Sequence, residues 1–195
     1  MTKGRRWIWW AVVLPPCILA VLAAGIGVLR HEARADFVDG SVAALMVSSA
    51  AFADGGRMPA TYTCDGSNVS PPLTIAAVPP ATKSLLILVD DLDAPIGFVH
   101  WIVFNVRPET LVIPEAAASK PGQLDRALQG RTDFDQVGYG GPCPPFGTHR
   151  YLFRVYALAT TLLLPEGATK PQVAAAAKHH VLAEGRITGV YHRAH

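Results

Sequence analysis

Short apolar runs, interrupted by glycine, proline and aspartate, dominate the chain from Met46 onward. Three of these runs are rich in β-branched and aromatic residues, which is typical of β-strands. A fourth, shorter run near the end of the chain has the same character. The predicted strands cover residues 84–89, 99–106, 151–158 and 187–191.

One stretch predicts a helix. It opens at Thr169, Lys170 and Pro171, because proline is favoured in the first turn, and the run QVAAAAKHHVLAEG carries it to Gly185 as the stop. Helical segments do not alternate with the strands, which excludes a series of βαβ units. The sequence therefore predicts an all-β fold with minor helices, arranged as an antiparallel β-sandwich.

The N-terminal part of the chain has a different pattern. Residues 7–29 contain no charged side chain, and about 20 apolar residues suffice to cross a bilayer as a helix. The basic residues Lys3, Arg5 and Arg6 precede the run, which favours a cytoplasmic N-terminus and an exported remainder. A cleaved signal peptide is the alternative, with a small-x-small pattern at residues 33–35, but the apolar run is longer than a usual signal core.

These patterns divide the chain into three parts. Residues 1–29 are expected to be a transmembrane anchor or signal sequence, residues 30–45 a juxtamembrane linker, and residues 46–195 the folded domain. Either N-terminal interpretation places the domain outside the cytoplasm, membrane-anchored or secreted after cleavage.

The distribution of charge along the chain limits the partners that the domain could bind. The chain has 17 Lys and Arg against 15 Asp and Glu. Five of the basic residues, but only Glu32 among the acidic ones, precede Asp36, so the domain itself has a slight acidic excess. A domain with this charge balance lacks the excess of positive charge that is typical of nucleic-acid-binding domains.

Two cysteines, Cys64 and Cys143, lie in the part expected to be exported. Oxidising compartments favour pairing of such cysteines, and both lie in turn-rich segments rather than in predicted strands. The sequence thus favours a disulfide between them, with two free buried thiols as the alternative.

Aspartate, histidine and tyrosine side chains that could bind a ligand lie in or near the ends of the predicted strands. Asp91 and Asp93 follow the first strand with the same parity, so they face the same way while the chain stays extended. His149 and Tyr151 also share parity at the start of the third strand. His100, in the second strand, has the parity of the apolar residues that follow it at 102 and 104, so it is expected to border an apolar face.

Several spaced segments resemble the signature regions of the phosphatidylethanolamine-binding protein family, which includes the Raf kinase inhibitor proteins. The similarity extends over about residues 47–193. The shorter bacterial branch is matched by YTCDGSNVSPPL and RTDFDQVGYGG. The segments that carry the family signature are DLDAP at 91–95, HWIVFN at 100–105 and GPCPPFGTHRYLFRVYAL at 141–158.

The resemblance implies a Greek-key sandwich with a small anion-binding cavity at one end. Asp91, His100, His149 and Tyr151 match the residues that line the family's pocket. Structural turn positions of the family are matched by Pro95, Gly141, Pro142 and Gly147. The loop at 96–99 is much shorter than in animal members and their extra C-terminal helix is missing, which puts kinase inhibition by homology in doubt.

The expected function is binding of phosphate or a phosphorylated head group. Asp91 is expected to orient and partly protonate a histidine, His100 and His149 to contact the anion, and Tyr151 to donate its hydroxyl, so that binding weakens as pH rises. No cofactor, metal or catalytic residue is expected. The alternatives are an inhibitor of a protease or kinase-like partner acting through its surface, and a weak hydrolase using His100 and Asp91.

Overall fold

The computed structural model describes residues 37–38, 41–119 and 124–193. The predicted anchor or signal sequence at residues 1–29 lies outside these described residues. Among the helices that are described, none is long and apolar enough to span a bilayer.

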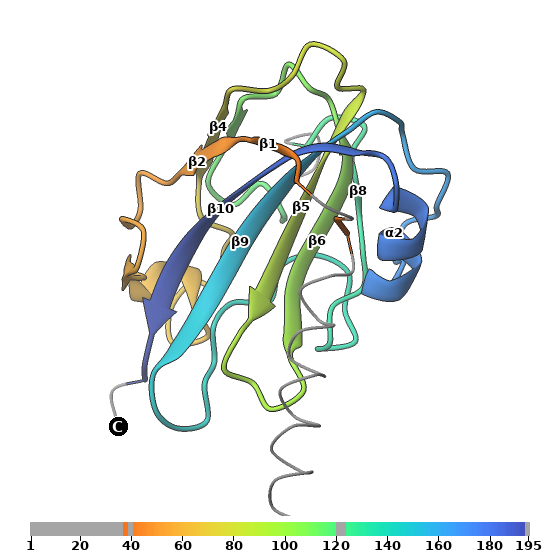
Figure 1. The fold of residues 1–195 in the computed structure, drawn as a ribbon. Helices are drawn as coiled ribbons and strands as arrows, with labels where there is room; N and C mark the ends of the chain where they lie inside the picture. Colours follow the sequence, from red (N-terminus) through yellow and green to blue (C-terminus); the bar gives the residue numbers. More distant parts are fainter. Residues whose placement is uncertain (1–36, 39–40, 120–123, 194–195) are drawn as a thin grey trace, which may run out of the picture. The chain divides into compact units, whose positions relative to one another are not determined.

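Four long strands form the centre of a seven-stranded sheet (Figure 1). They are β5 (Ser84–Asp91), β6 (Phe98–Val106), β9 (His149–Leu158) and β10 (Val181–Tyr191), and each pairs with its neighbour antiparallel in the order β10-β9-β5-β6. The edges carry three two-residue strands: β1 (Ala43–Ala44), β3 (Gly56–Arg57) and β8 (Leu128–Gln129).

A second, three-stranded sheet packs against the first. Its strands are β2 (Met46–Ser48), β4 (Leu73–Ala76) and β7 (Val112–Ile113), all antiparallel. The mostly-β prediction is confirmed. The antiparallel expectation is wrong for two edge strands, since β1 and β3 both pair with β10 in parallel.

The large sheet has an apolar layer on each face. The inter-sheet core lies between the two sheets and includes Val89, Phe153 and Ile75. The helix-side core lies on the other face, where residues of α2 such as Val173 pack against Leu88. Because both faces are covered, all eight residues of β5 are buried, and its middle, residues 85–89, is a continuous apolar run.

The predicted helix is shorter than expected. Helix α2 spans Lys170–Ala177 and begins where predicted, but it ends well before Gly185. His179 then adopts a left-handed φ of 65° and the chain enters β10. The long-range pairing of β10 with β9 outweighs the local helical pattern. Helix propensity is weak compared with tertiary contacts and is often overridden by them.

The packed domain also begins before Met46. Phe37 is 2% exposed and stacks on Tyr156 of β9 with ring centroids 5.0 Å apart, while β1 pairs with β10. Part of the range expected to be linker therefore belongs to the fold.

Candidate functional site

The carboxylate of Asp91 and the imidazole of His149 form the centre of the candidate site. Asp91 ends β5, His149 begins β9, and the register places Asp91 opposite Tyr151. Nδ1 of His149 lies 2.6 Å from Oδ2 of Asp91. Because a carboxylate oxygen only accepts, Nδ1 carries the hydrogen, and Nε2 is left for another partner.

The other carboxylate oxygen of Asp91 shapes the turn after β5. Oδ1 accepts the backbone N–H groups of Asp93 at 2.8 Å and Ala94 at 3.1 Å. An aspartate that binds the backbone two residues on is a recurrent turn former. Asp91 thus holds both the turn and His149 in place.

Asp93 is occupied by an arginine. Nε and a terminal NH2 group of Arg150 donate to the two oxygens of Asp93 at 2.9 and 2.7 Å, and the backbone N–H of Arg150 donates at 2.8 Å. This contact lowers the pKa of Asp93 and raises the pKa of Arg150. Asp93 therefore ties the turn to β9 and acts as a supporting residue.

His100 reaches the site through a β-bulge. In the pairing of β5 with β6, Val99 and Trp101 are matched to consecutive residues of β5, so His100 is the extra residue. Its ring packs edge-on against Tyr151 with centroids 5.1 Å apart. The prediction that His100 shares the face of Ile102 is wrong, because the bulge reverses the alternation and Ile102 lies in the helix-side core.

The surroundings of His100 favour the neutral form of its imidazole ring. Its Nδ1 lies 2.6 Å from the carbonyl oxygen of Gly140 and must donate to it. Burial lowers the pKa of His100, and the contact with Gly140 offsets this only in part. In the neutral ring Nε2 is therefore a hydrogen-bond acceptor, which differs from the expectation that both histidines donate to an anion.

The hydroxyl of Tyr151 is buried and makes no hydrogen bond of good geometry in the described structure, although the Asp91 carboxylate and the backbone of Cys143 lie near it. Burial and the nearby Asp91 carboxylate raise the pKa of Tyr151, so the hydroxyl keeps its hydrogen at neutral pH. A buried tyrosine hydroxyl usually finds a partner. This donor is thus available to a ligand beside the Asp91–His149 pair.

The four candidate residues are brought together by the fold. Their exposed fractions are 5% for Asp91, 3% for His100, 8% for His149 and 0% for Tyr151. The ring of Tyr151 contacts the rings of both histidines, with centroids 5.1 Å from His100 and 6.4 Å from His149. The parity predicted for His149 and Tyr151 agrees with the structure because β9 is regular there.

Aromatic side chains that the sequence analysis did not single out form one wall of the site. Phe134 and Phe98 contact each other at 4.7 Å between centroids, and each lies 5.2 Å from the ring of His100. Phe146 lies 6.5 Å from the ring of His149. Only the alternation of aromatic and glycine residues in these loops could have pointed to them.

The predicted turn residues shape the loops around the site. A Cβ on Gly141 would lie 2.5 Å from Oδ1 of Asn68, which accepts the Gly141 N–H. Gly147 has a left-handed φ of 70°, which favours glycine. Pro142 accepts the N–H of Cys64 at its carbonyl, and Pro95 occupies the second position of the turn closed by the Gly97 N–H and the Ala94 carbonyl.

Cys64 and Cys143 form a disulfide with Cα atoms 5.4 Å apart. The predicted pairing is confirmed. The bond fixes the loop that leads into His149 against the segment around Cys64.

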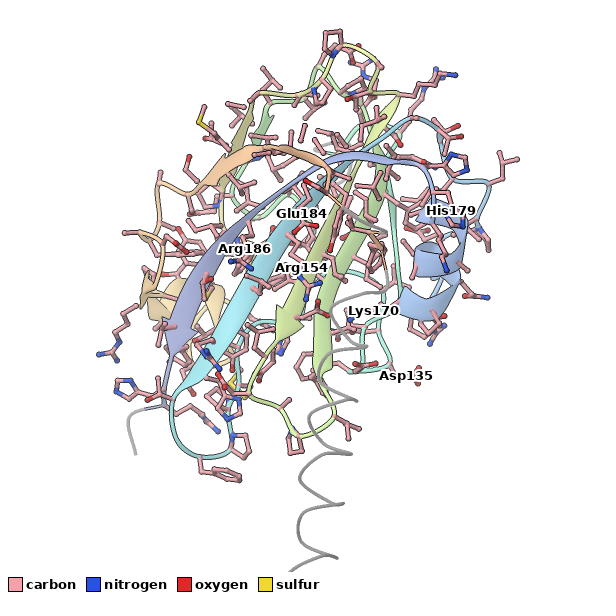
Figure 2. The ribbon with its side chains drawn as sticks, in the orientation of Figure 1. Asp135, Arg154, Lys170, His179, Glu184 and Arg186 are labelled. Atoms are coloured by element: carbon pink, nitrogen blue, oxygen red, sulfur yellow. A yellow bond between two sulfur atoms is a disulfide. The ribbon has the colours of Figure 1, made fainter. Side chains whose placement is uncertain are left out.

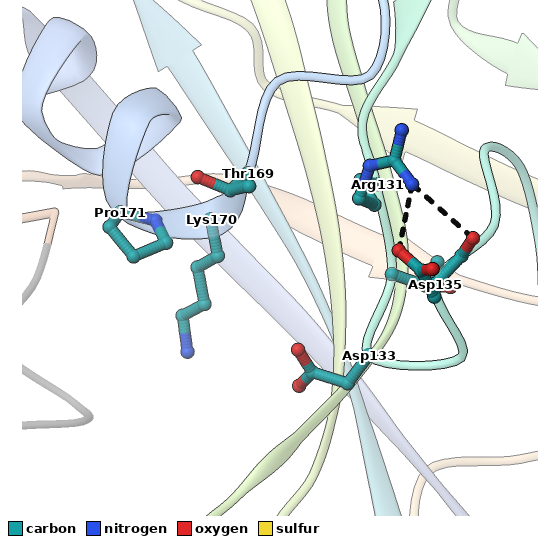
Figure 3. Close-up of a pocket in the computed structure, with 7 residues that line it drawn as sticks. Arg131, Asp133, Asp135, Thr169, Lys170 and Pro171 are labelled. Atoms are coloured by element: carbon teal, nitrogen blue, oxygen red, sulfur yellow. Dashed lines mark hydrogen bonds and ion pairs between the residues drawn. The ribbon is translucent and has the colours of Figure 1, made fainter.

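A shallow cavity of about 290 Å³ lies beside the start of α2 (Figure 3). Arg131 binds Asp135 at 2.7 Å, and Asp133 accepts the Val99 N–H at 2.7 Å. Lys170 reaches Asp90 at 3.2 Å. The charges around this cavity are therefore engaged with the protein, which agrees with a loop-ordering role for the 131–133 segment.

A buried ionic cluster lies on the helix side of the sheet. Asp90 is 3.1 Å from Arg154 and 3.2 Å from Lys170. Figure 2 shows Arg154 with Glu184 and Arg186 on the neighbouring strand and Lys170 at the start of α2. Asp90 and Asp91 thus point to opposite faces, and only Asp91 contributes to the candidate site. Within the described ranges, no group of three or more possible metal ligands is found.

Comparison with known proteins places this fold and site in a family. Residues 48–192 match the model of the phosphatidylethanolamine-binding protein family. The chain is 46% identical over 144 residues to a UPF0098 protein of Methanothermobacter thermautotrophicus, covering 73% of this chain and 95% of that protein. The chain therefore belongs to the phosphatidylethanolamine-binding protein family.

Two solved structures share the fold. One is described as a phosphatidylethanolamine-binding protein homologue, CT736 of Chlamydia trachomatis, with a TM-score of 0.70 and 35% identity over 77% of this chain and 99% of that one. The other is E. coli YbcL, described as a member of the mammalian PEBP family, with a TM-score of 0.72 and 33% identity over 78% of this chain and 100% of that one.

Proposed function

We propose that the domain is a binding protein, not an enzyme, and that its ligand is a small oxyanion such as phosphate or a phosphorylated head group. The ligand would lie between His149 and Tyr151, next to His100. The observation that carries the proposal is the buried Tyr151 hydroxyl, without a hydrogen bond of good geometry, beside an imidazole oriented by Asp91.

The donors at the site suit an oxyanion. A protonated His149 donates Nδ1–H to Asp91 and presents Nε2–H to the ligand. The Tyr151 hydroxyl adds a second donor. Hydrogen bonds to charged groups are worth about 1.5–3 kcal/mol each, so two of them support specific recognition of an anion.

His100 affects which protonation state of the ligand the site would bind. Its neutral ring donates to the Gly140 carbonyl and leaves Nε2 as an acceptor. An acceptor favours a ligand that carries a hydrogen on one oxygen, such as monoprotonated phosphate, over a fully deprotonated anion.

Backbone donors of the glycine-rich loop are less available than the sequence suggests. The N–H of Gly140 donates to the His100 carbonyl and the N–H of Gly141 donates to Asn68. The side chains of His149 and Tyr151 therefore carry the recognition in this proposal.

Calorimetric titration of the full chain with phosphate and with phosphoethanolamine tests the proposal. Both ligands are expected to bind the parent chain, and Tyr151→Phe should weaken binding because it removes the hydroxyl donor beside His149. No binding by the parent chain, or equal affinity of the parent chain and Tyr151→Phe, would contradict the assignment.

Two features support a binding protein over a hydrolase. Cys64 and Cys143 are joined and offer no thiolate, and His100 is held neutral in an aromatic environment with no hydroxyl nucleophile bound to it in the described structure. Hydrolysis of chromogenic phosphate esters that disappears in His100→Ala would instead establish catalysis.

An extracytoplasmic location is part of the proposal. The apolar run at residues 7–29 and the Cys64–Cys143 bond both suit an exported domain. Digestion of intact spheroplasts with an added protease should remove the domain, while a cytoplasmic marker stays protected.

A further inference from the structure

The peptide group between Gly140 and Gly141 connects the candidate site to an exposed residue, Asn68. Its carbonyl oxygen accepts the Nδ1–H of His100, with 2.6 Å between the two heavy atoms. Its N–H donates to Oδ1 of Asn68 at 2.8 Å. One peptide plane therefore makes a hydrogen bond to the histidine on one side and to the asparagine on the other.

Close packing on both sides of this peptide group requires glycine at both positions. A Cβ on Gly140 would lie 2.4 Å from Cδ2 of Phe134. A Cβ on Gly141 would lie 2.6 Å from the carbonyl oxygen of Tyr62. Two consecutive glycines restrict the backbone dihedral angles very little, so sterics within the chain leave the plane between them free to turn. Its orientation therefore depends on its hydrogen bonds.

The neighbouring hydrogen bonds of the loop act on other peptide groups. The N–H of Gly140 donates to the His100 carbonyl at 2.9 Å, but this N–H belongs to the preceding peptide group. The following peptide group has no N–H, because it ends at Pro142. The contacts with Asn68 and His100 therefore set the orientation of the plane between Gly140 and Gly141.

Asn68 is held in a defined position beside the loop. It has a left-handed φ of 54°, a conformation in which asparagine is several-fold enriched among residues other than glycine. The segment before it is fastened to the same loop twice. The hydroxyl of Tyr139 donates to the Tyr62 carbonyl at 2.8 Å, and Cys64 is joined to Cys143. The side-chain oxygen of Asn68 is therefore a fixed acceptor for the loop.

Loss of this acceptor would leave a buried donor unpaired. Gly141 is buried, and an unpaired buried N–H costs free energy comparable to a lost hydrogen bond. The plane can recover a partner by turning, which would direct the Gly141 N–H, instead of the Gly140 carbonyl, toward Nδ1 of His100. A neutral imidazole whose Nδ1 accepts a hydrogen bond carries its hydrogen on Nε2. The orientation of one peptide plane thus decides which ring nitrogen of His100 is protonated.

We propose that Asn68 is a positioning residue that holds the Gly140 carbonyl toward His100 and thereby makes Nε2 of His100 an acceptor that selects phosphate against sulfate. The two anions have the same shape, but at neutral pH phosphate keeps an O–H and sulfate has none. A site with a buried acceptor discriminates against the anion that cannot donate to it, because the acceptor is then left unpaired. The selection rests on the proposed function, whereas the tautomer of His100 requires no ligand.

Nuclear magnetic resonance tests the tautomer in the absence of ligand. Long-range proton–nitrogen spectra of the full chain in detergent, with ¹⁵N-labelled histidine, show which ring nitrogen carries the hydrogen. The signals of His100 are assigned by their absence in His100→Gln. Near neutral pH the ring is neutral, because burial lowers the pKa of His100. The parent chain should show hydrogen on Nδ1, and Asn68→Gly should shift the signals toward the form with hydrogen on Nε2.

Two further variants separate positioning from a general structural role. Glycine at position 68 keeps the left-handed backbone and removes the acceptor, whereas Asn68→Asp keeps an acceptor oxygen and should restore the parent tautomer. Asn105→Gly is the matched control. Asn105 also has a left-handed φ, of 61°, and its Oδ1 accepts the Leu162 N–H at 2.7 Å, but it lies near the opposite end of β6 from His100.

Asn105→Gly should lower the free energy of unfolding without moving the signals of His100. Urea unfolding of the same samples shows that each variant is folded and measures its stability. A parent tautomer that persists in Asn68→Gly, or an equal shift in Asn105→Gly, would overturn the positioning role.

Calorimetric titration with phosphate and with sulfate tests the selection. The parent chain should bind phosphate more tightly than sulfate. Asn68→Gly should lower the ratio of the two affinities about fivefold, the factor expected for the loss of one net hydrogen bond, and Asn105→Gly should leave the ratio unchanged. Equal affinities of the parent chain for the two anions would overturn the selection.

The two measurements distinguish this proposal from the proposed function. A tautomer that shifts in Asn68→Gly, in a parent chain that binds neither anion, supports the positioning role and contradicts the proposed function. Phosphate binding by a parent chain whose His100 tautomer is unmoved in Asn68→Gly supports the function and contradicts the positioning role.

Discussion

Asp91 and His149 are 58 residues apart in the sequence and meet at 2.6 Å, as the last residue of one central strand and the first of its neighbour. The contact fixes the imidazole tautomer and aims Nε2 away from Asp91. Asp91 also accepts two backbone N–H groups from the turn after β5. One carboxylate thereby sets both the orientation of a candidate ligand donor and the turn beside it.

Replacing His149 with leucine should weaken phosphate binding about tenfold to hundredfold, because a hydrogen bond to a charged partner is worth about 1.5–3 kcal/mol. Calorimetric titration measures the change. His192→Leu is the matched control, since His192 is exposed and outside the site. Equal affinities for the two variants would remove His149 from the binding site.

Tyr151→Phe separates a binding role from a structural one. The hydroxyl makes no hydrogen bond of good geometry in the described structure, so its removal should change the free energy of unfolding by no more than about 0.5 kcal/mol, or stabilise the fold. Phosphate binding should nevertheless weaken. Urea unfolding and calorimetric titration of the same sample measure the two effects.

Tyr139→Phe is the control with the opposite outcome. The Tyr139 hydroxyl donates to the Tyr62 carbonyl at 2.8 Å, so its removal should lower the free energy of unfolding by about 1 kcal/mol. Phosphate affinity should stay unchanged. A Tyr151→Phe variant that loses stability without losing affinity would contradict the assigned role of Tyr151.

The burial of His100 predicts that the free energy of unfolding depends on pH. Burial lowers its pKa below the value of 6.5 for an exposed histidine. Between the folded and unfolded pKa values the unfolded chain binds a proton that the folded chain does not, so the free energy of unfolding rises with pH through that window. The stabilisation is complete above the unfolded pKa and is lost as pH falls toward the folded pKa.

Urea unfolding between about pH 7 and about pH 5 measures this dependence. His100→Gln should flatten the profile, whereas His192→Gln should leave it as in the parent chain. A profile unchanged by His100→Gln would show that another group causes the acid sensitivity.

The strands were predictable because their signal is local. The apolar runs at 84–89 and 151–158 lie within β5 and β9, and the regular alternation of β9 places His149 and Tyr151 together as expected. The position of His100 was not predictable in the same way. A bulge depends on how two strands align, and one extra residue reverses the face of every side chain before it.

Other features depend on contacts that no local pattern carries. The residues after Ala177 continue a helical pattern, yet they form β10 because β9 offers a long partner. The cluster of Asp90, Arg154 and Lys170 joins two strands and a helix start. Only the resemblance to the family predicted that Asp91 and His100 lie in the same site. The spacing of these two residues in the sequence does not predict it.

Removing the disulfide should affect both stability and binding. Cys64 and Cys143 are separated by 79 residues, and closing a loop of that length stabilises by about 4 kcal/mol in the chain-entropy model. Cys143 also begins the loop that ends at His149, and the Cys64 N–H donates to the Pro142 carbonyl. Cys64→Ser with Cys143→Ser should therefore lower the free energy of unfolding by a few kcal/mol and weaken phosphate binding.

Reductant provides the control for this variant. Dithiothreitol should bring the parent chain to the stability of the double variant and leave the double variant unchanged. Cys17 is present in both proteins, so any effect of reductant on that thiol is shared by them. A parent chain that keeps its stability and phosphate affinity when Cys64 and Cys143 are reduced would show that hydrogen bonds such as that of Gly141 to Asn68, at 2.8 Å, hold the loop without the disulfide.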